Sequence, residues 1–179
     1  AVAAVGLANQ WFFIYNLVVF GIVSGSVIYI AQFFGKRDFD SLQLPVACSL
    51  FLCFAVSAIF AFFAIAFPQF VMGLFTNNAE TISCGVPYLR IVGITYILLA
   101  ISFPIASAMR STEVAVLPLI ITGAALCINT LFNYVLINGH FGAPALGVSG
   151  AAIATTTARL FETIVMLIIM MKGITPIRL

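Results

Sequence analysis

The sequence predicts an all-α membrane protein with five transmembrane helices, and three observations lead to this fold class. Of the 179 residues, 64% are hydrophobic and only 7% are charged, whereas a soluble domain carries about 25% charged residues. The mean hydropathy is +1.24, more apolar surface than a water-soluble fold of this size could bury. The apolar runs also reach the roughly 20 residues that a helix needs to cross a bilayer, too long for the alternating strands of about 10 residues in a membrane β-barrel.

Five apolar runs qualify as membrane spans. They cover approximately residues 6–34, 44–67, 86–109, 114–137 and 148–171. Trp11, Tyr15 and Tyr88 lie towards the ends of these runs, where interfacial aromatic residues are common. The stretch 67–81 is less apolar, and we expect it to form a short interfacial helix between the second and third spans.

The basic residues predict the orientation of the spans in the cell membrane. Lys and Arg fall in residues 35–40, 110–113 and 172–179, three stretches that five spans place on one side. The opposite connections hold only Arg90, just inside the third span, and His140. The positive-inside rule therefore predicts that the three basic stretches are cytoplasmic in a multi-pass protein of the plasma membrane. The chain then starts outside without a signal-peptide pattern, so we expect a further helix upstream of it.

Composition and motifs exclude several classes of function. The net charge of +2 and the lack of a basic run argue against a nucleic-acid partner. The four cysteines show no ligand-like spacing and indicate packing residues rather than disulfides or metal ligands. His140 has no carboxylate or cysteine near it in sequence, and there is no phosphate-binding loop. The sequence therefore predicts neither an enzyme nor a cofactor, and any transport would draw on an ion gradient or on the substrate itself.

Small residues cluster in two places inside the spans. Gly21 and Gly25 are four residues apart, and Gly147, Gly150 and Ala151 open the fifth span. Such faces allow close contact between helices. They predict helix packing, with the alternative that they let helices slide or bend during a transport cycle.

Two asparagines interrupt the fourth span. Asn129 and Asn133 are one turn apart on one helix face, and amides should avoid lipid, so both are expected to face other helices or a cavity. One interpretation is an interhelical hydrogen bond, worth about 0.6 kcal/mol on average. The other is a site for a hard cation or a substrate, to which the amide oxygens contribute. A short loop between antiparallel spans would place Thr155 at a similar depth, which makes Asn129, Asn133 and Thr155 the candidate cation-coupling or substrate-binding residues, although threonine often bonds to its own helix backbone.

The fifth span also contains charged residues. Arg159 lies about 16 Å along it, near the middle of the membrane, and Glu162 follows three residues later on the same face. Unpaired charges at this depth are costly, so the two are expected to pair with each other or with residues of another helix, in either a structural or a gating role. Apart from a possible Na+ at Asn129 and Asn133, the sequence predicts no metal site.

Several segments together resemble the multidrug and toxic compound extrusion (MATE) family. The run "INTLFNYVLINGHFGAPALGVSGAAIATTTAR" resembles the family's fifth and sixth helices. "AQFFGKRD" is similar to the end of its second helix, and "YLRIVG" and "PIASAMRST" are similar to the start and end of its fourth. "AVAAVGLANQ" looks like the link between its first and second helices. Each motif is loose alone, but they occur in order over essentially the whole chain.

The resemblance implies a fold, an activity and a set of partners. The family has twelve helices in two pseudo-symmetric lobes of six, of which this chain would hold helices two to six of the N-terminal lobe, a partial lobe that spans residues 1–179. Members export cationic or amphipathic drugs by alternating access, in exchange for Na+ or H+. The implied partners are such a small-molecule substrate, the lipid bilayer, and the missing first helix and C-terminal lobe of the same chain.

The resemblance also implies roles for the polar residues. In the N-terminal lobe of the family, an acidic residue of helix one joins polar residues of helices five and six in a cation site. Asn129 matches the helix-five asparagine, Asn133 matches a position that is aspartate in some members, and Thr155 is the nearest match to the helix-six hydroxyl. Without an aspartate at 133, the negative charge of this site would have to come from helix one.

Two other functions stay open at this point. A lipid-linked oligosaccharide flippase of the same superfamily would need cationic residues in its cavity, but buried charges are few and Glu162 is placed to cancel Arg159. A non-transporting membrane scaffold would tolerate alanine at Asn129 and Asn133 without loss of any flux.

Overall fold

The computed structural model describes residues 2–139 and 144–172, and all regular secondary structure in this part of the chain is α-helical. Its helices are α1 (Val2–Gly35), α2 (Phe39–Ala66), α3 (Pro68–Gly73), α4 (Ala79–Ser111), α5 (Val116–Asn138) and α6 (Val148–Met171). All but α3 are long and apolar enough to cross a membrane. The five predicted spans and the short helix between the second and third are therefore confirmed as helices. His140 and Arg178 lie outside the described residues.

The helix ends agree best with the prediction at α6, whose bounds coincide with the predicted span. α2 and α4 begin several residues before the predicted starts at 44 and 86 because polar side chains cap them. The Asp38 carboxylate accepts the Ser41 backbone N–H at 3.0 Å, and the Asn78 side chain accepts that of Thr81 at 3.1 Å. Hydropathy locates the apolar part of a helix, whereas the cap determines where the helix starts.

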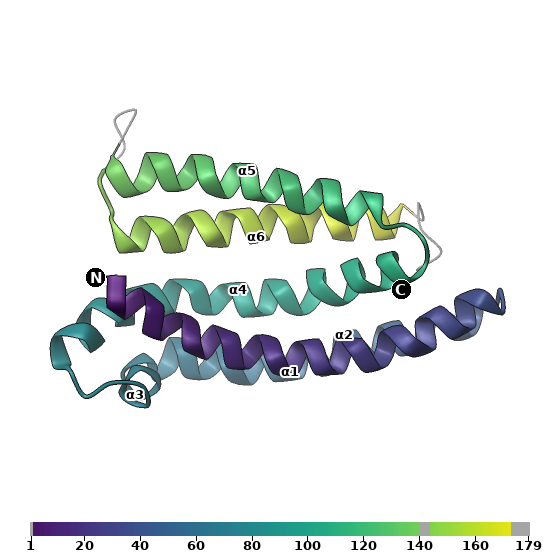
Figure 1. The fold of residues 1–179 in the computed structure, drawn as a ribbon, viewed down its shortest axis with the longest axis horizontal. Helices are drawn as coiled ribbons and strands as arrows, with labels where there is room; N and C mark the ends of the chain where they lie inside the picture. The colour runs from purple at the N-terminus through teal and green to yellow at the C-terminus, as the bar shows by residue number, and fades with distance from the viewer. Residues whose placement is uncertain (1, 140–143, 173–179) are drawn as a thin grey trace.

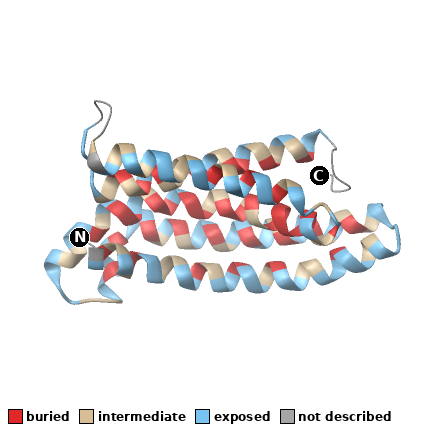
Figure 2. Cartoon of the chain, turned by 45° about the horizontal axis from the view of Figure 1, so that its top comes forward, coloured by how far each residue is buried: buried red, intermediate tan, exposed pale blue. Residues whose placement is uncertain are grey.

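α4 is the central helix of the bundle. It runs between the α1–α2 pair and the α5–α6 pair (Figure 1) and packs on α1, α2 and α6. Within the most apolar stretch of each helix, 67% of α4 is buried but only 11% of α5. Figure 2 shows the buried residues concentrated in the interior of the bundle, with exposed residues along the outer helices. The peripheral helices thus present apolar side chains outward, as a lipid environment requires.

The core contains a hydrogen-bonded aromatic group between α1, α2 and α4. The Tyr15 hydroxyl donates to the Tyr96 carbonyl oxygen at 2.8 Å and pairs with the Ser57 hydroxyl at 2.8 Å. Tyr15 and Tyr96 are both fully buried. The prediction that Tyr15 is an interfacial aromatic residue is therefore wrong. α1 starts at Val2, which puts Tyr15 about 20 Å along the helix at ~1.5 Å per residue, well inside the bundle.

The two small-residue faces have different outcomes. A Cβ atom on Gly150 would lie 2.6 Å from the Leu136 carbonyl oxygen, so this glycine permits the predicted close approach of α6 to α5. A Cβ atom on Gly21 or Gly25 would meet nothing within 4 Å. The close contact predicted at Gly21 and Gly25 is therefore wrong for the described part of the chain, where both glycines are exposed on α1.

The cysteines are all free thiols. Cys53 is buried in the core as predicted for a packing residue, whereas Cys48, Cys84 and Cys127 are exposed. The packing interpretation is therefore wrong for these three, since hydropathy alone does not tell which side of a membrane helix faces its neighbours.

Candidate functional site

A line of polar side chains lies along the contact between α5 and α6, and we name it the polar seam. It consists of Thr122, Asn129 and Asn133 from α5 and Thr155, Arg159 and Glu162 from α6. The two helices run antiparallel as a hairpin (Figure 1), and Gly150 lets them approach closely near its connection. Residues that are distant in sequence therefore meet at the same depth.

One end of the polar seam is a relay of amides and a hydroxyl. Asn133 donates through Nδ2 to Asn129 Oδ1 at 3.0 Å, and Asn129 donates through Nδ2 to Thr155 Oγ1 at 3.4 Å. The Thr155 hydroxyl in turn donates to the Ala151 carbonyl oxygen at 3.0 Å. This geometry confirms that Thr155 lies at the depth of Asn129, and it also confirms the expected bond from Thr155 to its own helix backbone.

The Asn133 side chain leaves one acceptor unused. Its Oδ1 atom is buried and has no hydrogen-bond partner within the described residues. A buried acceptor without a partner costs about 1–3 kcal/mol. Such an atom is placed to accept a hydrogen bond or to contact a cation that comes from outside the described helices.

The other end of the polar seam is a buried carboxylate. Arg159 NH1 donates to Glu162 Oε2 at 2.7 Å, and the Thr122 hydroxyl donates to Glu162 Oε1 at 2.9 Å. The ion pair predicted from the three-residue spacing is therefore present. Both carboxylate oxygens are occupied, and the Glu162 side chain is only 7% exposed, against 35% for Arg159. The ion pair is therefore asymmetric: the Glu162 carboxylate is buried, whereas the Arg159 side chain is partly exposed.

Thr122 is a member of the site that the sequence analysis missed. It precedes Asn129 by seven residues, two helical turns, and so lies on the same face of α5. This seven-residue spacing was the one feature of the sequence that could have indicated Thr122 as part of the site. A lone threonine in an apolar run more often bonds to its own helix backbone, as Thr130 does to Leu126 at 2.9 Å, so its spacing alone did not single it out.

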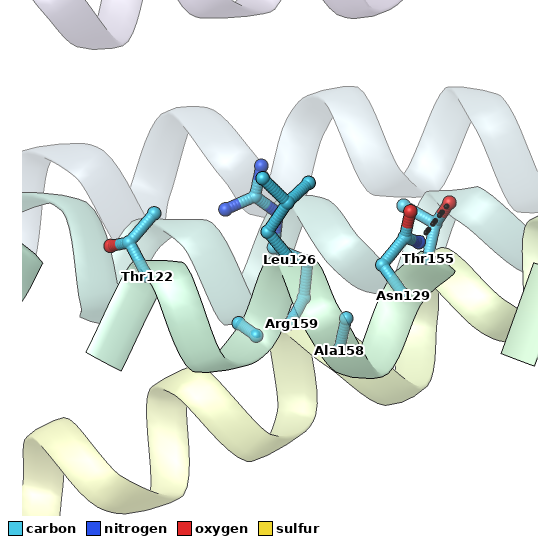
Figure 3. Close-up of a pocket in the computed structure, with 7 residues that line it drawn as sticks. Thr122, Leu126, Asn129, Thr155, Ala158 and Arg159 are labelled. Carbon is cyan, nitrogen blue, oxygen red and sulfur yellow. Dashed lines mark hydrogen bonds between the residues drawn. The ribbon is translucent and has the colours of Figure 1, made fainter. Parts of the chain in front are cut away.

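A pocket of about 200 Å³ lies between the two ends of the polar seam (Figure 3). Its lining consists of Thr122, Ala125, Leu126 and Asn129 of α5 with Thr155, Ala158 and Arg159 of α6. Sites for whole drug-sized ligands occupy about 300–1,000 Å³, and a water takes about 30 Å³. The pocket can therefore hold an ion with a few waters or one substituent of a larger ligand.

The described residues supply only part of a cation site. The relay offers neutral oxygens, and the carboxylate of Glu162 is occupied by Arg159 and Thr122. In the same part of the chain, no group of three or more His, Cys, Asp or Glu side chains could hold a metal ion. The polar seam could bind Na+ only with further ligands, such as the acidic residue that the resemblance places on helix one.

Comparisons with known proteins agree with this architecture. The chain is 31% identical to the uncharacterized transporter YisQ of Bacillus subtilis (strain 168), in an alignment that covers 97% of the chain and 38% of YisQ. It is 28% identical to the probable multidrug resistance protein YoeA of the same organism, in an alignment that covers 99% of the chain and 38% of YoeA. The probable multidrug resistance protein NorM of Thermotoga maritima is 27% identical to the chain, in an alignment that covers 89% of the chain and 34% of NorM. The chain thus spans well under half the length of these relatives.

A solved structure shares the fold. It belongs to a MOP superfamily transporter from Pyrococcus furiosus Vc1, for which the reverse polarity of the binding pocket suggests a different function. The TM-score is 0.80 at 18% identity, over 93% of this chain and 37% of that one. The family model MatE matches residues 1–135, most of the chain. The chain therefore belongs to the MatE family, which consists of multi-pass membrane transporters and not of enzymes.

Proposed function

We propose that the protein to which this chain belongs exports cationic or amphipathic drugs by alternating access, in exchange for Na+ or H+ and without any other cofactor. The observation that carries the proposal is the relay from Asn133 through Asn129 to Thr155 beside the pocket. Membership of the MatE family and the multidrug-resistance names of two relatives support the efflux activity.

The unused Oδ1 of Asn133 is the physical argument for coupling. A hard cation takes oxygen ligands, and a buried acceptor with no partner has the most to gain from one. A bound cation would also fix the positions of α5 and α6 relative to any helix that supplies its other ligands. The binding of Na+ in this way, or of H+ at the acidic residue implied on helix one, would favour one of the two states that alternating access requires.

The arrangement of the chain in the membrane is part of the proposal. Residues 1–179 form helices two to six of an N-terminal lobe, which the first helix and the C-terminal lobe of the same protein complete. The basic stretches 35–40, 110–113 and 172–179 face the cytoplasm. The hairpin end of α5–α6 then lies towards the outer side, so the relay is nearer the outer surface than the ion pair.

Ethidium efflux from efflux-deficient cells that express the full-length protein tests the proposal, with and without a Na+ gradient. Wild type is compared with Asn133→Ala at matched membrane expression. The control is Thr130→Ala on the same helix, because the Thr130 side chain is exposed and, among the described residues, bonds only to its own helix backbone. We expect efflux and its ion dependence to fall in Asn133→Ala and to persist in the control.

Other outcomes would reject specific parts of the proposal. If the wild type exports no ethidium, the proposed multidrug activity is rejected and a lipid-linked oligosaccharide flippase is favoured. If efflux is unchanged in Asn133→Ala, the proposed efflux function stands, but Asn133 has a packing role rather than a role in coupling.

A further inference from the structure

A second pocket lies between α1 and α4, away from the polar seam. Its volume is about 430 Å³, and both helices contribute polar side chains to its lining, Ser24 from α1 and Ser107, Arg110 and Ser111 from α4. Among the described residues that line it, only Arg110 is ionisable and none is acidic. The pocket therefore presents a positive charge to whatever occupies it.

Arg110 has no acidic partner in the part of the chain that the structure describes. Its one hydrogen bond to a described residue runs from NH2 to the Ser107 hydroxyl at 2.8 Å, and the ion pair found among these residues joins Arg159 and Glu162 instead. Glu113 follows three residues later, beyond the end of α4, and forms no ion pair with Arg110. Since a guanidinium has five N–H donors, most of this one stays available for an anion.

Two hydroxyl groups add hydrogen-bond donors beside the guanidinium. Ser107 is only 7% exposed, accepts from Arg110 and donates to no other described residue. Ser24, on the other helix, makes no hydrogen bond to a described residue. Ser111, by contrast, donates back to the Ala108 carbonyl oxygen at 2.8 Å, as serine in a helix often does. The pocket thus offers unused N–H and O–H groups from both helices, which suits a group with several acceptor oxygens, such as phosphate.

The pocket lies at the depth of lipid headgroups. Arg110 is in the last turn of α4, at the end of a helix that is long enough to cross the membrane. It opens the basic stretch 110–113, which the orientation proposed above places in the cytoplasm. Figure 1 shows the α1–α2 hairpin extending past this end of α4. Basic pockets between membrane helices on the cytoplasmic side are a common arrangement for binding anionic headgroups.

An exposed apolar stripe leads from the pocket towards the middle of the membrane. Phe13, Leu17, Phe20 and Ser24 follow one another at spacings of four, three and four residues and therefore share one face of α1. The first three side chains are each more than half exposed. From Ser24 to Phe13 the stripe covers about 16 Å along the helix axis. This length is about half of the hydrocarbon core and so matches the depth of one leaflet.

We propose that this pocket binds the phosphate headgroup of an anionic phospholipid from the cytoplasmic leaflet. Arg110, Ser107 and Ser24 donate to the phosphate oxygens, and an acyl chain lies along the apolar stripe of α1. A free anion would use only the polar part of this surface, whereas a phospholipid complements both parts. A zwitterionic lipid would place its cationic choline beside Arg110, so an anionic headgroup is favoured. The bound lipid would bridge α1 and α4, a role that goes beyond efflux and does not depend on it.

Native mass spectrometry of the full-length purified protein tests this proposal. The delipidated protein is titrated with phosphatidylglycerol and, separately, with phosphatidylcholine that has identical acyl chains. We expect wild type to bind phosphatidylglycerol at least about fivefold more tightly, a modest preference for charge-assisted hydrogen bonds. Thermal unfolding in the same detergent gives a second readout, because a lipid bound to the folded state raises the midpoint. Phosphatidylglycerol should raise it more than phosphatidylcholine does.

Three variants relate this preference to the pocket. Arg110→Gln removes the charge but keeps an amide that can donate to Ser107, and it should reduce the preference to about twofold or less. Ser24→Ala changes an exposed residue without a described partner, so it should fold normally and lower the preference about two- to threefold. Lys36→Gln is the matched control, because Lys36 is an exposed cation beyond the end of α1 and outside the pocket lining. It should keep the wild-type preference.

Four results would overturn the proposal. Two of them are equal affinity of wild type for the two lipids and an unchanged preference in Arg110→Gln. The third is an equal loss in Lys36→Gln, since the preference would then reflect the overall positive charge of this side of the protein. The fourth concerns free anions. If inorganic phosphate at the same concentration raises the wild-type midpoint as much as phosphatidylglycerol does, the pocket binds a soluble anion and not a lipid.

Discussion

The hydroxyl of Tyr15 donates a 2.8 Å hydrogen bond to the backbone carbonyl oxygen of Tyr96, across the contact between α1 and α4. The same hydroxyl pairs with Ser57 of α2 at 2.8 Å, so one buried atom links three helices. The Tyr96 hydroxyl, by contrast, is buried without a partner in the part of the chain that the structure describes. Two neighbouring tyrosines thus differ in whether their hydroxyl groups contribute to stability.

Removing the two hydroxyls should have opposite effects. Tyr15→Phe breaks the link and should lower the free energy of unfolding by about 0.6–1.7 kcal/mol, the range for interhelical hydrogen bonds in membranes. Tyr96→Phe removes a buried group without a partner and should be neutral or stabilising. Unfolding of the full-length protein in detergent measures both, with each variant as the other's control. Equal losses would show that the Tyr15 hydrogen bonds are not the cause.

Gly150 should be far less tolerant of alanine than Gly21. Alanine favours a helix by up to about 1 kcal/mol over glycine, so Gly21→Ala, which meets no atom within 4 Å, should be neutral or stabilising. The Cβ atom of Gly150→Ala would lie 2.6 Å from the Leu136 carbonyl oxygen and push α6 away from α5. Overpacking of this kind costs about 1–3 kcal/mol. Thermal unfolding in detergent should show a lower midpoint for Gly150→Ala alone.

Asn133 should be a position where stability and function diverge. Asn133→Leu loses the donor to Asn129 but also removes the buried Oδ1 without a partner. The first effect is worth about 0.6 kcal/mol and the second about 1–3 kcal/mol in the opposite direction. We therefore expect an unchanged or raised midpoint of thermal unfolding together with reduced efflux. A large loss of stability would instead identify Asn133 as a packing residue.

The start of α2 should depend on pH through Asp38. Hydrogen bonds from Ser41 lower the pKa of the Asp38 carboxyl below its ordinary value of 3.8. Because the folded-state pKa is depressed, the stabilisation is fully present above pH 3.8 and is lost as the pH falls through the folded-state value. Hydrogen-exchange protection of the Ser41 amide should therefore be retained above pH 3.8 and should drop only as the pH falls below that value.

Asp38→Asn provides the control for this measurement. Asparagine caps a helix about as well as aspartate but does not titrate. Protection of the Ser41 amide should then not change as the pH falls below 3.8. An equal drop in this variant would mean that the acid effect arises elsewhere in the protein.

The sequence predicted the helices well because span length and hydropathy are properties of the local chain. It also predicted that Thr155 meets Asn129 and that Arg159 pairs with Glu162, since both follow from helical spacing and a short hairpin connection. It could not predict that Tyr15 is buried or that Gly21 is exposed. Lipid and protein interior are similarly apolar, so hydropathy does not distinguish a helix face that contacts lipid from one that contacts another helix.

The site shows the same limit. The contribution of Thr122 to the site and the asymmetry of the ion pair depend on which helices pack together. Local sequence patterns do not indicate which helices are neighbours. Glu162 is buried and accepts the hydrogen bond that Thr122 donates across the α5–α6 contact, whereas Arg159 is partly exposed.

The peripheral position of α5 has a consequence for biogenesis. α5 packs mainly on α6 and touches α4 only sparsely, so it has little to bind in the bundle before α6 is made. During synthesis, Asn129 and Asn133 would enter the bilayer before Thr155 exists to accept the bond from Asn129. The two helices are thus expected to leave the translocation machinery as one hairpin, with the amides already covered. Any substitution that weakens the α5–α6 contact would then reduce the yield of inserted protein before it affected transport.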